Sequence, residues 1–289
     1  TETYEEAESL DDLRLSLMVY RALVGAGRLE AAAKFYRGSF GKALFYQLNA
    51  YATMIELLTP LFPNGDLDTL PMIEDVGDKS YILNDFALAL QFTGSSRAAL
   101  RQYSLALSLY LEQAYAPDLS AVLGNYANAL QDLNGLAGSH RAYSLNREVA
   151  SAAVDRSQIM AADRYLLESS TLRGDWEGAA AAEARLQDDD FYYSNLGRAR
   201  LRFYRGEDAR PFIAAGLDDA RSVRWLNGQM WLLALRAEVE LADGNLDDAD
   251  DALDQALAIA RRSGSYSQAP YTALLAEIRL AQGDLQAAK

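Results

Sequence analysis

Cysteine is absent from the 289-residue sequence, and histidine occurs once, as His140. Without cysteine, neither disulfide bonds nor thiolate zinc sites can stabilise the fold, and a reducing, cytoplasmic location is expected. A single histidine excludes histidine-rich metal sites and leaves any Ser/His/Asp triad only one possible base. No catalytic motif lies beside His140, so we expect it on the surface or in a groove, without a catalytic role.

Long apolar runs and an excess of basic charge are missing as well. The longest charge-free stretches, such as residues 43–55, contain Gln, Asn and Thr and fall short of the roughly 20 apolar residues that a membrane span needs. No basic start followed by an apolar run indicates a signal peptide. With 27 basic and 41 acidic side chains, the formal net charge is −14, which repels a nucleic-acid backbone. We therefore expect neither membranes nor nucleic acids as partners.

No motif for a cofactor, a metal ion or catalysis is complete. Residues 36–43 come nearest to a phosphate-binding loop, but its first glycine and the hydroxyl residue after its lysine are both replaced. The acidic runs 188–190 and 247–251 do not match the ligand spacing of a calcium loop. We predict that residues 188–190 form a solvated turn, where Asp189→Ala changes stability little, and that residues 247–251 lie in the first turn of a helix. The sequence therefore assigns no catalytic, cofactor-binding or metal-binding residue.

A short pattern recurs along the chain: a small residue, any residue, usually an apolar residue, two more, and then usually alanine. Its anchors lie 29 to 40 residues apart. They are Gly27, Gly65, Gly94, Asn134, Gly174, Gly206, Gly244 and Gly283. Apolar residues flank each anchor at intervals of three and four, which indicates amphipathic helices. Each repeat is therefore predicted to be two helices joined by a short turn.

The residues of the turn explain the pattern. Glycine or asparagine can adopt the left-handed conformation that ends the first helix, and a following Asp, Asn or Glu suits the first turn of the second. A small residue is expected five places after the anchor, because two antiparallel helices cross closely there. Ala32, Ala99, Ala179 and Ala249 occupy this position.

Two segments, residues 83–91 and 123–131, align without gaps over the predicted first helix, and five of their nine residues are identical. At these segments the chain resembles the tetratricopeptide repeat family, whose first helix has large, large, small and large residues at fixed places. In the first segment these are Leu83, Phe86, Ala87 and Leu90. The resemblance covers nearly the whole chain and implies an all-α, right-handed superhelix of about seven to eight helix-turn-helix repeats.

We expect three parts within a single continuous solenoid. Residues 1–58 are predicted to form N-terminal helical repeats, and residues 59–79 an irregular insert with three of the six prolines and one short helix. Residues 80–289 are predicted to form tetratricopeptide-like repeats, truncated in the last one. The repeats exceed the usual 34 residues, so the loops between them are predicted to be long. The repeat at Gly206 has Pro211 at the small position, which leaves its register open.

We place function in the groove, because the first helices of such repeats line the concave side of a superhelix. Recurring amides on these helices can pair with the backbone of an extended peptide, although they are equally consistent with solvated polar positions. The predicted partner-binding residues are Tyr81, Asn84, Gln91, Asn125, Asn128, Gln131 and Arg164. The resemblance places Asn125 and Asn128 where family members grip a terminal carboxylate with lysines; those lysines are absent, and Arg164 is a substitute candidate. Tyr192, Tyr193 and Tyr204 are less clearly core residues and are further candidates for the groove.

We predict a non-enzymatic domain that binds a protein or peptide. Residues 123–127 and 242–249 resemble the sensor arms of bacterial signalling ATPases related to the maltose-regulon activator, which implies ligand or protein sensing and an ATPase domain elsewhere in the same polypeptide. The chain opens at Thr1 and ends one turn into a helix, so we expect a piece of a longer protein. One alternative is a free-standing scaffold or adaptor. A third hypothesis is an all-helical enzyme with a carboxylate pair, which a deep pocket holding two acids of perturbed pKa would favour.

Overall fold

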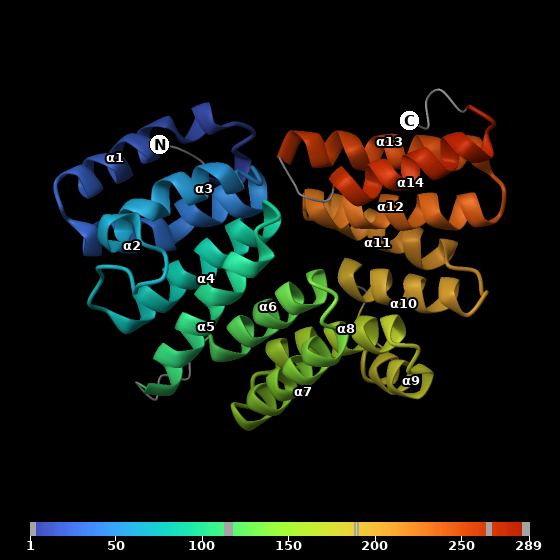
Figure 1. Cartoon of the computed structure of the whole chain (residues 1–289), viewed down its shortest axis with the longest axis horizontal. Helices are drawn as coiled ribbons and strands as arrows, with labels where there is room; N and C mark the ends of the chain where they lie inside the picture. The colour runs from blue at the N-terminus through green and yellow to red at the C-terminus, as the bar shows by residue number, and fades with distance from the viewer. Residues whose placement is uncertain (1–3, 113–117, 188, 190, 264–267, 285–289) are drawn as a thin grey trace. The chain divides into compact units, whose positions relative to one another are not determined.

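The computed structural model describes residues 4–112, 118–187, 189, 191–263 and 268–284. These residues form fourteen α-helices with short 3₁₀ and π segments and contain no β-strand (Figure 1). The all-α prediction is therefore confirmed. None of the helices in these ranges is long and apolar enough to cross a membrane.

The chain forms two compact units, residues 1–162 (unit 1) and residues 163–289 (unit 2). The division falls inside α8 (Arg156–Leu172). Each unit has its own set of packed helix pairs. The single continuous solenoid stays a prediction.

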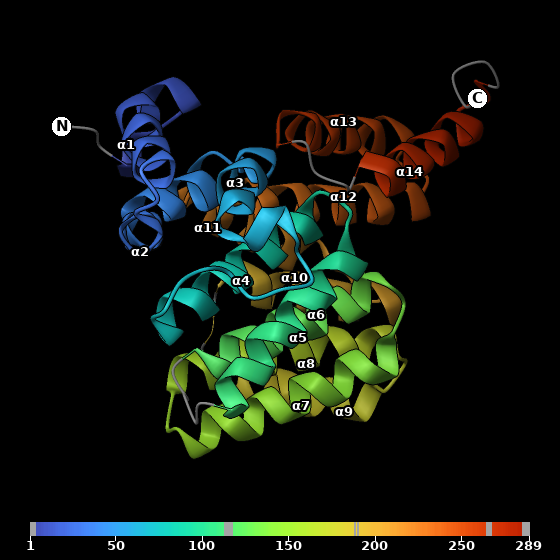
Figure 2. The same ribbon diagram turned by 60° about the vertical axis from the view of Figure 1, so that its left-hand side comes forward.

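Unit 1 is built from seven helices and the first part of α8. They are α1 (Arg14–Gly25), α2 (Leu29–Phe35), α3 (Tyr51–Leu58), α4 (Val76–Phe92), α5 (Ser96–Glu112), α6 (Leu119–Asp132) and α7 (Leu136–Ala152). Helix α4 packs on α5, α5 on α6 and α6 on α7, while α4 also touches α6 (Figure 1, Figure 2). The first helices of these two repeats, α4 and α6, therefore lie side by side. Buried aromatic side chains, including Tyr36, Tyr51 and Phe86, fill the core of this unit.

The segment between α3 and α4 has little regular structure. Two single 3₁₀ turns, Thr59–Leu61 and Pro63–Gly65, occupy its first part, where the sequence predicts one short helix. Helix α4 begins at Val76, because Oδ1 of Asp75 accepts a hydrogen bond from the backbone N–H of Asp78 at 2.8 Å and caps the helix. The irregular backbone therefore ends at residue 75, four residues before the predicted limit of the insert.

Unit 2 continues with the rest of α8 and six more helices. They are α9 (Trp176–Arg185), α10 (Tyr192–Tyr204), α11 (Arg210–Ser222), α12 (Leu226–Ala242), α13 (Leu246–Ser263) and α14 (Gln268–Ala281). Consecutive helices from α10 to α14 pack on one another, and α12 also touches α10 and α14. The apolar core of this unit is rich in alanine and leucine.

The predicted turn geometry is confirmed. All eight anchors, from Gly27 to Gly283, have a positive φ between 60° and 87°. The small residues that follow Gly27, Gly94, Asn134, Gly174 and Gly244 by five places are completely buried; these are Ala32, Ala99, Ser139, Ala179 and Ala249. Close helix crossing therefore explains the recurring alanine.

The structure settles the register after Gly206. The turn from α10 to α11 has five residues, 205–209, so Pro211 falls in the first turn of α11, where its missing N–H costs no hydrogen bond. Ile213 then takes the fourth helical position, which alanine or serine holds in the other second helices, and it is only 2% exposed. At this crossing, isoleucine therefore takes the place of the usual alanine or serine between α11 and the helix it packs on.

The prediction of long loops between repeats is wrong at two connections. Residues 153–155 join α7 to α8, and residues 223–225 join α11 to α12, so both turns have three residues, as do turns within repeats. The extra length lies in the helices, because α4, α5, α7, α8 and α12 each have 17 residues. Val154 and Arg224 adopt the left-handed conformation that glycine usually takes, with φ of 55° and 54°. The sequence does not reveal these two turns, because valine and arginine rarely occupy a turn position with positive φ.

Candidate partner-binding surfaces

Two of the predicted partner-binding residues join neighbouring first helices of unit 1. Asn125 on α6 donates a hydrogen bond from Nδ2 to Oδ1 of Asn84 on α4, at 2.9 Å. Nδ2 of Asn84 lies 3.5 Å from Oδ1 of Asp85. Both asparagines are half-buried. The open polar atom of this pair is Oδ1 of Asn125, which accepts no hydrogen bond from the residues that the structure describes.

Asn128 and Gln131 continue this row along α6, because residues three places apart are neighbours on a helix surface. Oδ1 of Asn128 accepts a hydrogen bond from the hydroxyl of Tyr143 on α7, and its Nδ2 donates to none of the described residues. Oε1 of Gln131 is buried and has no donor within the described ranges. We call Asn84, Asn125, Asn128 and Gln131 the amide row. It offers an open acceptor at Asn125 and an open donor at Asn128, one helical turn apart.

Gln91, which aligns with Gln131, is fully engaged inside unit 1. Its Nε2 donates to Oδ2 of Asp132 on α6 at 2.8 Å, and its Oε1 accepts from the hydroxyl of Tyr103 on α5 at 3.1 Å. The side chain is buried. Gln91 therefore ties α4 to α5 and α6, and its polar atoms are not open to a partner.

Tyr81 belongs to a polar cluster near the start of α4. The guanidinium of Arg37 lies over its ring, 5.5 Å from the centroid, and pairs through Nη1 with Oδ1 of Asp78 at 2.9 Å. The Tyr81 hydroxyl also bonds the buried carboxyl of Asp85. Burial raises the pKa of Asp85 to about 7, although hydrogen bonds from Asn84 and Tyr81 act in the opposite direction. The amide row therefore lies beside a carboxyl group that titrates near neutral pH.

Arg164 anchors the connection between α9 and α10 inside unit 2. Its Nε and Nη2 donate to the two carboxylate oxygens of Asp189, at 2.7 and 3.0 Å, and its guanidinium stacks 4.3 Å from the ring centroid of Phe191. Ser194 donates to Oδ2 of Asp189 at 2.6 Å. Burial raises the pKa of Asp189, but the hydrogen bonds from Arg164 and Ser194 and the charge of Arg164 outweigh it and lower the pKa.

This geometry corrects the prediction for the first acidic run. Asp189 is 7% exposed and paired, so it does not lie in a solvated turn, and its removal is expected to cost stability. Asp188 and Asp190 lie outside the described residues. The second run is closer to the prediction, because Asp247 and Asp248 lie in the first turn of α13. Asp250, however, pairs with Arg279 of α14 at 2.8 Å.

A charged cluster covers the first helices of unit 2. Glu168 on α8 accepts a hydrogen bond from the hydroxyl of Tyr193 at 2.6 Å and pairs with Arg200, both on α10. Burial and the charge of Glu277 raise the pKa of Glu238 on α12, and the charge of Arg200 lowers it. Sequence reasoning missed Arg200, because arginine at a helix position gives no sign of a buried ion pair.

The three tyrosines proposed for the groove differ in burial. Tyr192 is 1% exposed, so the prediction is wrong for this residue: its ring meets Trp225 at 5.0 Å between centroids. A Cβ on Gly228 would lie 2.8 Å from the Tyr192 ring, so this glycine makes room for the aromatic pair. Tyr193 is half-buried in the charged cluster, and Tyr204 is exposed.

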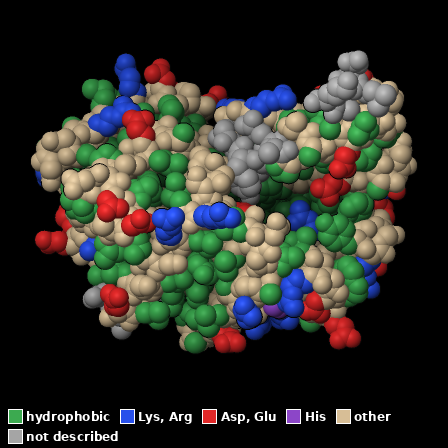
Figure 3. Space-filling model, in the orientation of Figure 1, with side chains coloured by type: hydrophobic (Ala, Val, Ile, Leu, Met, Phe, Trp, Pro, Cys, Tyr) green, Lys and Arg blue, Asp and Glu red, His purple; other side chains and the backbone are tan. Residues whose placement is uncertain are grey.

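The two acids with raised pKa belong to different units, Asp85 to unit 1 and Glu238 to unit 2. Neither of them lines the pocket of about 290 Å³ between α11 and α12. No group of three or more potential metal ligands occurs in the described ranges. His140 is half-buried on α7. Acidic and basic side chains are interspersed with hydrophobic ones on the face drawn in Figure 3.

Comparison with known proteins shows similarity of fold. No family model and no curated protein matches the sequence. The structure is similar to apo RapI, with a TM-score of 0.59 and 13% identity over 87% of this chain and 98% of that chain. A Rap protein complexed with competence and sporulation factor gives a TM-score of 0.55 and 16% identity over 97% and 90% of the chains. A tetratricopeptide repeat protein from Parabacteroides merdae gives 0.50 and 17% over 92% and 98%.

At these identities the comparisons bear on the fold and leave the partner open. The consecutive packing of paired helices in this chain agrees with the similarity in fold that the TM-scores show. The chain therefore has the all-helical fold of tetratricopeptide repeat proteins.

Proposed function

We propose that this chain is a non-enzymatic protein-binding domain, in which the amide row of unit 1 holds an extended segment of a partner. The observation that carries the proposal is the pair of open polar atoms on α6, Oδ1 of Asn125 and Nδ2 of Asn128. An extended backbone presents N–H and C=O groups, which match an acceptor and a donor of this kind. Binding through them would not depend on the partner's side chains.

The internal hydrogen bonds of the row support this role. Asn84 fixes Nδ2 of Asn125, and Tyr143 fixes Oδ1 of Asn128, so each open atom is oriented before a partner arrives. Such preorganisation lowers the entropic cost of binding. Gln91 and Arg164 stand outside the proposal, because their polar groups are engaged internally.

The similar structures are consistent with a binding role. One of them is a Rap protein complexed with competence and sporulation factor. For the present chain, we propose a protein or peptide partner in the cytoplasm, with the sensor arm of a bacterial signalling ATPase as the leading context and a free-standing scaffold as the alternative. The full-length coding sequence separates these two: a phosphate-binding loop in the same polypeptide supports the sensor arm.

The binding role is tested by exchanging one atom of the row. Asn128→Asp keeps the oxygen that accepts from Tyr143 and replaces the open Nδ2 donor with a second acceptor, which repels a partner carbonyl. The control, Gln255→Glu, makes the same chemical change at an exposed amide on α13. The two variants and the unchanged chain are used to capture proteins from a lysate of the source organism, followed by quantitative mass spectrometry.

We expect Asn128→Asp to reduce capture of a specific partner about tenfold or more, since a lost hydrogen bond together with a repelled carbonyl is worth about 1 to 3 kcal/mol. Gln255→Glu should leave that capture unchanged. Thermal melting followed by circular dichroism checks that both variants are folded. Equal capture by all three proteins, with folding intact, would remove the amide row from the binding role.

A further inference from the structure

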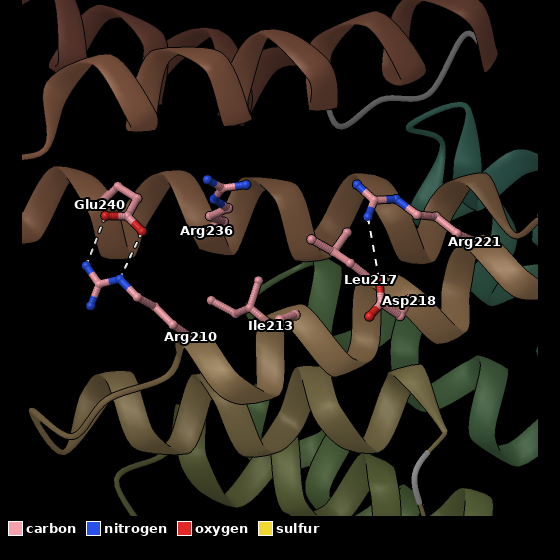
Figure 4. Close-up of a pocket in the computed structure, with 8 residues that line it drawn as sticks. Arg210, Ile213, Leu217, Asp218, Arg221, Arg236 and Glu240 are labelled. Atoms are coloured by element: carbon pink, nitrogen blue, oxygen red, sulfur yellow. Dashed lines mark hydrogen bonds and ion pairs between the residues drawn. The ribbon is translucent and has the colours of Figure 1, made fainter.

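The pocket between α11 and α12 belongs to unit 2, and none of its lining residues belongs to the amide row or to the charged cluster around Glu168. Its volume is about 290 Å³. Figure 4 shows an ion pair at each end of the pocket, Arg210 with Glu240 and Arg221 with Asp218, and Arg236 of α12 between them. The arrangement combines an apolar floor with guanidinium groups.

The floor is formed by Ile213 and Leu217, which lie one turn apart on α11 and therefore share a helix face. They are only 2% and 4% exposed. Ala214 lines the same pocket and is exposed, so it lies at the rim. A ligand that enters can thus bury an apolar chain against α11.

The guanidinium of Arg210 already pairs with two carboxylates, those of Glu240 and Asp243. Its Nε and Nη2 donate to Glu240 at 3.0 and 2.9 Å, and Nη2 also reaches Oδ2 of Asp243 at 2.6 Å. Hydrogen bonds to Glu240 and Asp243 raise the pKa of Arg210, and the bond from Arg210 lowers the pKa of Glu240 despite burial. Arg221 pairs with Asp218 at 3.7 Å across an exposed surface. Neither pair leaves an anion for Arg236.

Arg236 makes no ion pair with any residue that the structure describes, although its charge contributes to the lowered pKa of Glu240. It is half-buried. The two acids of the lining, Glu240 and Asp218, are already paired with Arg210 and Arg221, so of the three lining arginines only Arg236 lacks a direct ion pair among the described residues. A half-buried guanidinium without a counterion favours an anionic ligand, and carboxylates match its planar fork of donors.

We propose that this pocket binds a small free carboxylate with a short apolar chain, in which the carboxylate pairs with Arg236 and the chain packs on Ile213 and Leu217. The volume supports a small ligand, because pockets for drug-sized molecules run from about 300 to 1,000 Å³. A neutral apolar molecule would leave Arg236 without a counterion. A small inorganic anion would make no apolar contact with Ile213 and Leu217.

The test uses hexanoate as the probe and the whole chain in solution. Methyl NMR signals of Ile213 and Leu217 report binding at the pocket itself. Hexanamide supplies the apolar chain without the charge, and acetate supplies the charge with little chain. We expect hexanoate to shift both methyl signals saturably and to bind about tenfold or more tightly than either comparator. Hexanamide lacks the charge-assisted hydrogen bonds to Arg236, and acetate lacks most of the apolar contact with α11.

Two substitutions locate the site, and one serves as a control. Arg236→Gln removes the charge and should weaken hexanoate binding about tenfold or more. Ala214→Phe fills the pocket from its exposed rim and should abolish the methyl shifts that hexanoate induces. Arg141→Gln removes an exposed arginine on α7 in unit 1 and should leave hexanoate affinity unchanged.

Four results would overturn the proposal. Hexanamide that binds as tightly as hexanoate would show that Arg236 plays no part, and unchanged affinity in folded Arg236→Gln would show the same. Stronger binding of a short peptide with a free C-terminal leucine, by about tenfold or more, would assign the pocket to a peptide terminus instead. Unchanged binding in folded Ala214→Phe would place hexanoate elsewhere.

Discussion

Asp189 holds the connection between α9 and α10, because it accepts hydrogen bonds from Arg164 and Ser194 while nearly fully buried. Asp189→Ala leaves the Arg164 guanidinium without its counterion. We expect a loss of about 2 to 4 kcal/mol in the free energy of unfolding, measured by urea denaturation. The control, Asp254→Ala at an exposed position on α13, should change that free energy by no more than about 0.5 kcal/mol.

The contribution of Asp189 also depends on pH. Its pKa is lowered in the folded state, so its stabilising effect is present above the unfolded pKa of about 4 and is lost as pH falls through the folded pKa. The difference between the unchanged chain and Asp189→Ala should therefore shrink in acid. A difference that stays constant down to about pH 2 would contradict the ionised pair.

Asp85 has the opposite pH dependence, because burial raises its pKa to about 7. From about pH 4 to about pH 7 the unfolded chain releases the Asp85 proton while the folded chain retains it, so stability falls as pH rises. Asp85→Asn removes this titration. We expect the variant to be more stable than the unchanged chain by up to a few kcal/mol at about pH 8, and the gain to become much smaller near pH 4. Urea denaturation at both pH values measures this.

The Asp85 prediction has its own control. Asp254→Asn, at an exposed position, should show the same difference from the unchanged chain at both pH values. A gain for Asp85→Asn that is equal in acid and at about pH 8 would show that Asp85 does not titrate in this range. The sequence did not single out Asp85, because only the packed structure buries its carboxyl beside Tyr81.

At the scale of the elements, the turn between α7 and α8 holds Val154 in a backbone conformation that is unfavourable for valine. A β-branched residue there has φ of 55° and an 85% exposed side chain. Left-handed backbone costs a residue with a Cβ about 1 to 2 kcal/mol, against about 0.5 to 1 kcal/mol of entropy for glycine. Val154→Gly should therefore raise the free energy of unfolding by about 0.5 to 1 kcal/mol, measured by thermal melting. Val223→Gly, where φ is −90°, should lower it instead.

The crossing of α6 with its neighbours has no room for a larger side chain. Ala127 is completely buried on α6, so Ala127→Trp overpacks the helix pair. We expect a loss of about 1 to 3 kcal/mol or more in the free energy of unfolding, measured by thermal melting with circular dichroism. Ala137→Trp, at an exposed position on α7, should be nearly neutral. Equal losses from both would contradict the assigned register.

The elements differ in how well the sequence predicts them. The anchor glycines and Asn134 mark their turns correctly, because few other residues favour a positive φ. The turns at Val154 and Arg224 escape prediction, because valine and arginine rarely adopt a positive φ and therefore give no turn signal in the sequence. At the candidate surface, Gln91 and Gln131 have the same pattern, yet only Gln91 meets an aspartate, Asp132 of the following repeat. Pattern alone cannot separate an internal bridge from an open amide.

At the scale of the whole molecule, helices pack mainly on their sequence neighbours, so a local change should remain local. Ala127→Trp is expected to increase amide hydrogen exchange in α4 to α7 while protection of α12 and α13 in unit 2 stays unchanged. Hydrogen exchange followed by mass spectrometry measures both regions in one sample. A uniform increase over both units would show one cooperative folding unit.

The sequence by itself determined the helical repeats, their turns and the small residues at the crossings, because backbone conformation and periodic hydrophobicity are local properties. Tertiary structure decided which polar side chains are engaged and which are open. Asp189 is buried in a pair, Gln91 bridges two repeats, and Arg236 makes no direct ion pair with any of the described residues. Arg164 lies 25 positions from Asp189, and Asp132 lies 41 positions from Gln91, so the spacing of residues along one helix does not reveal these pairs.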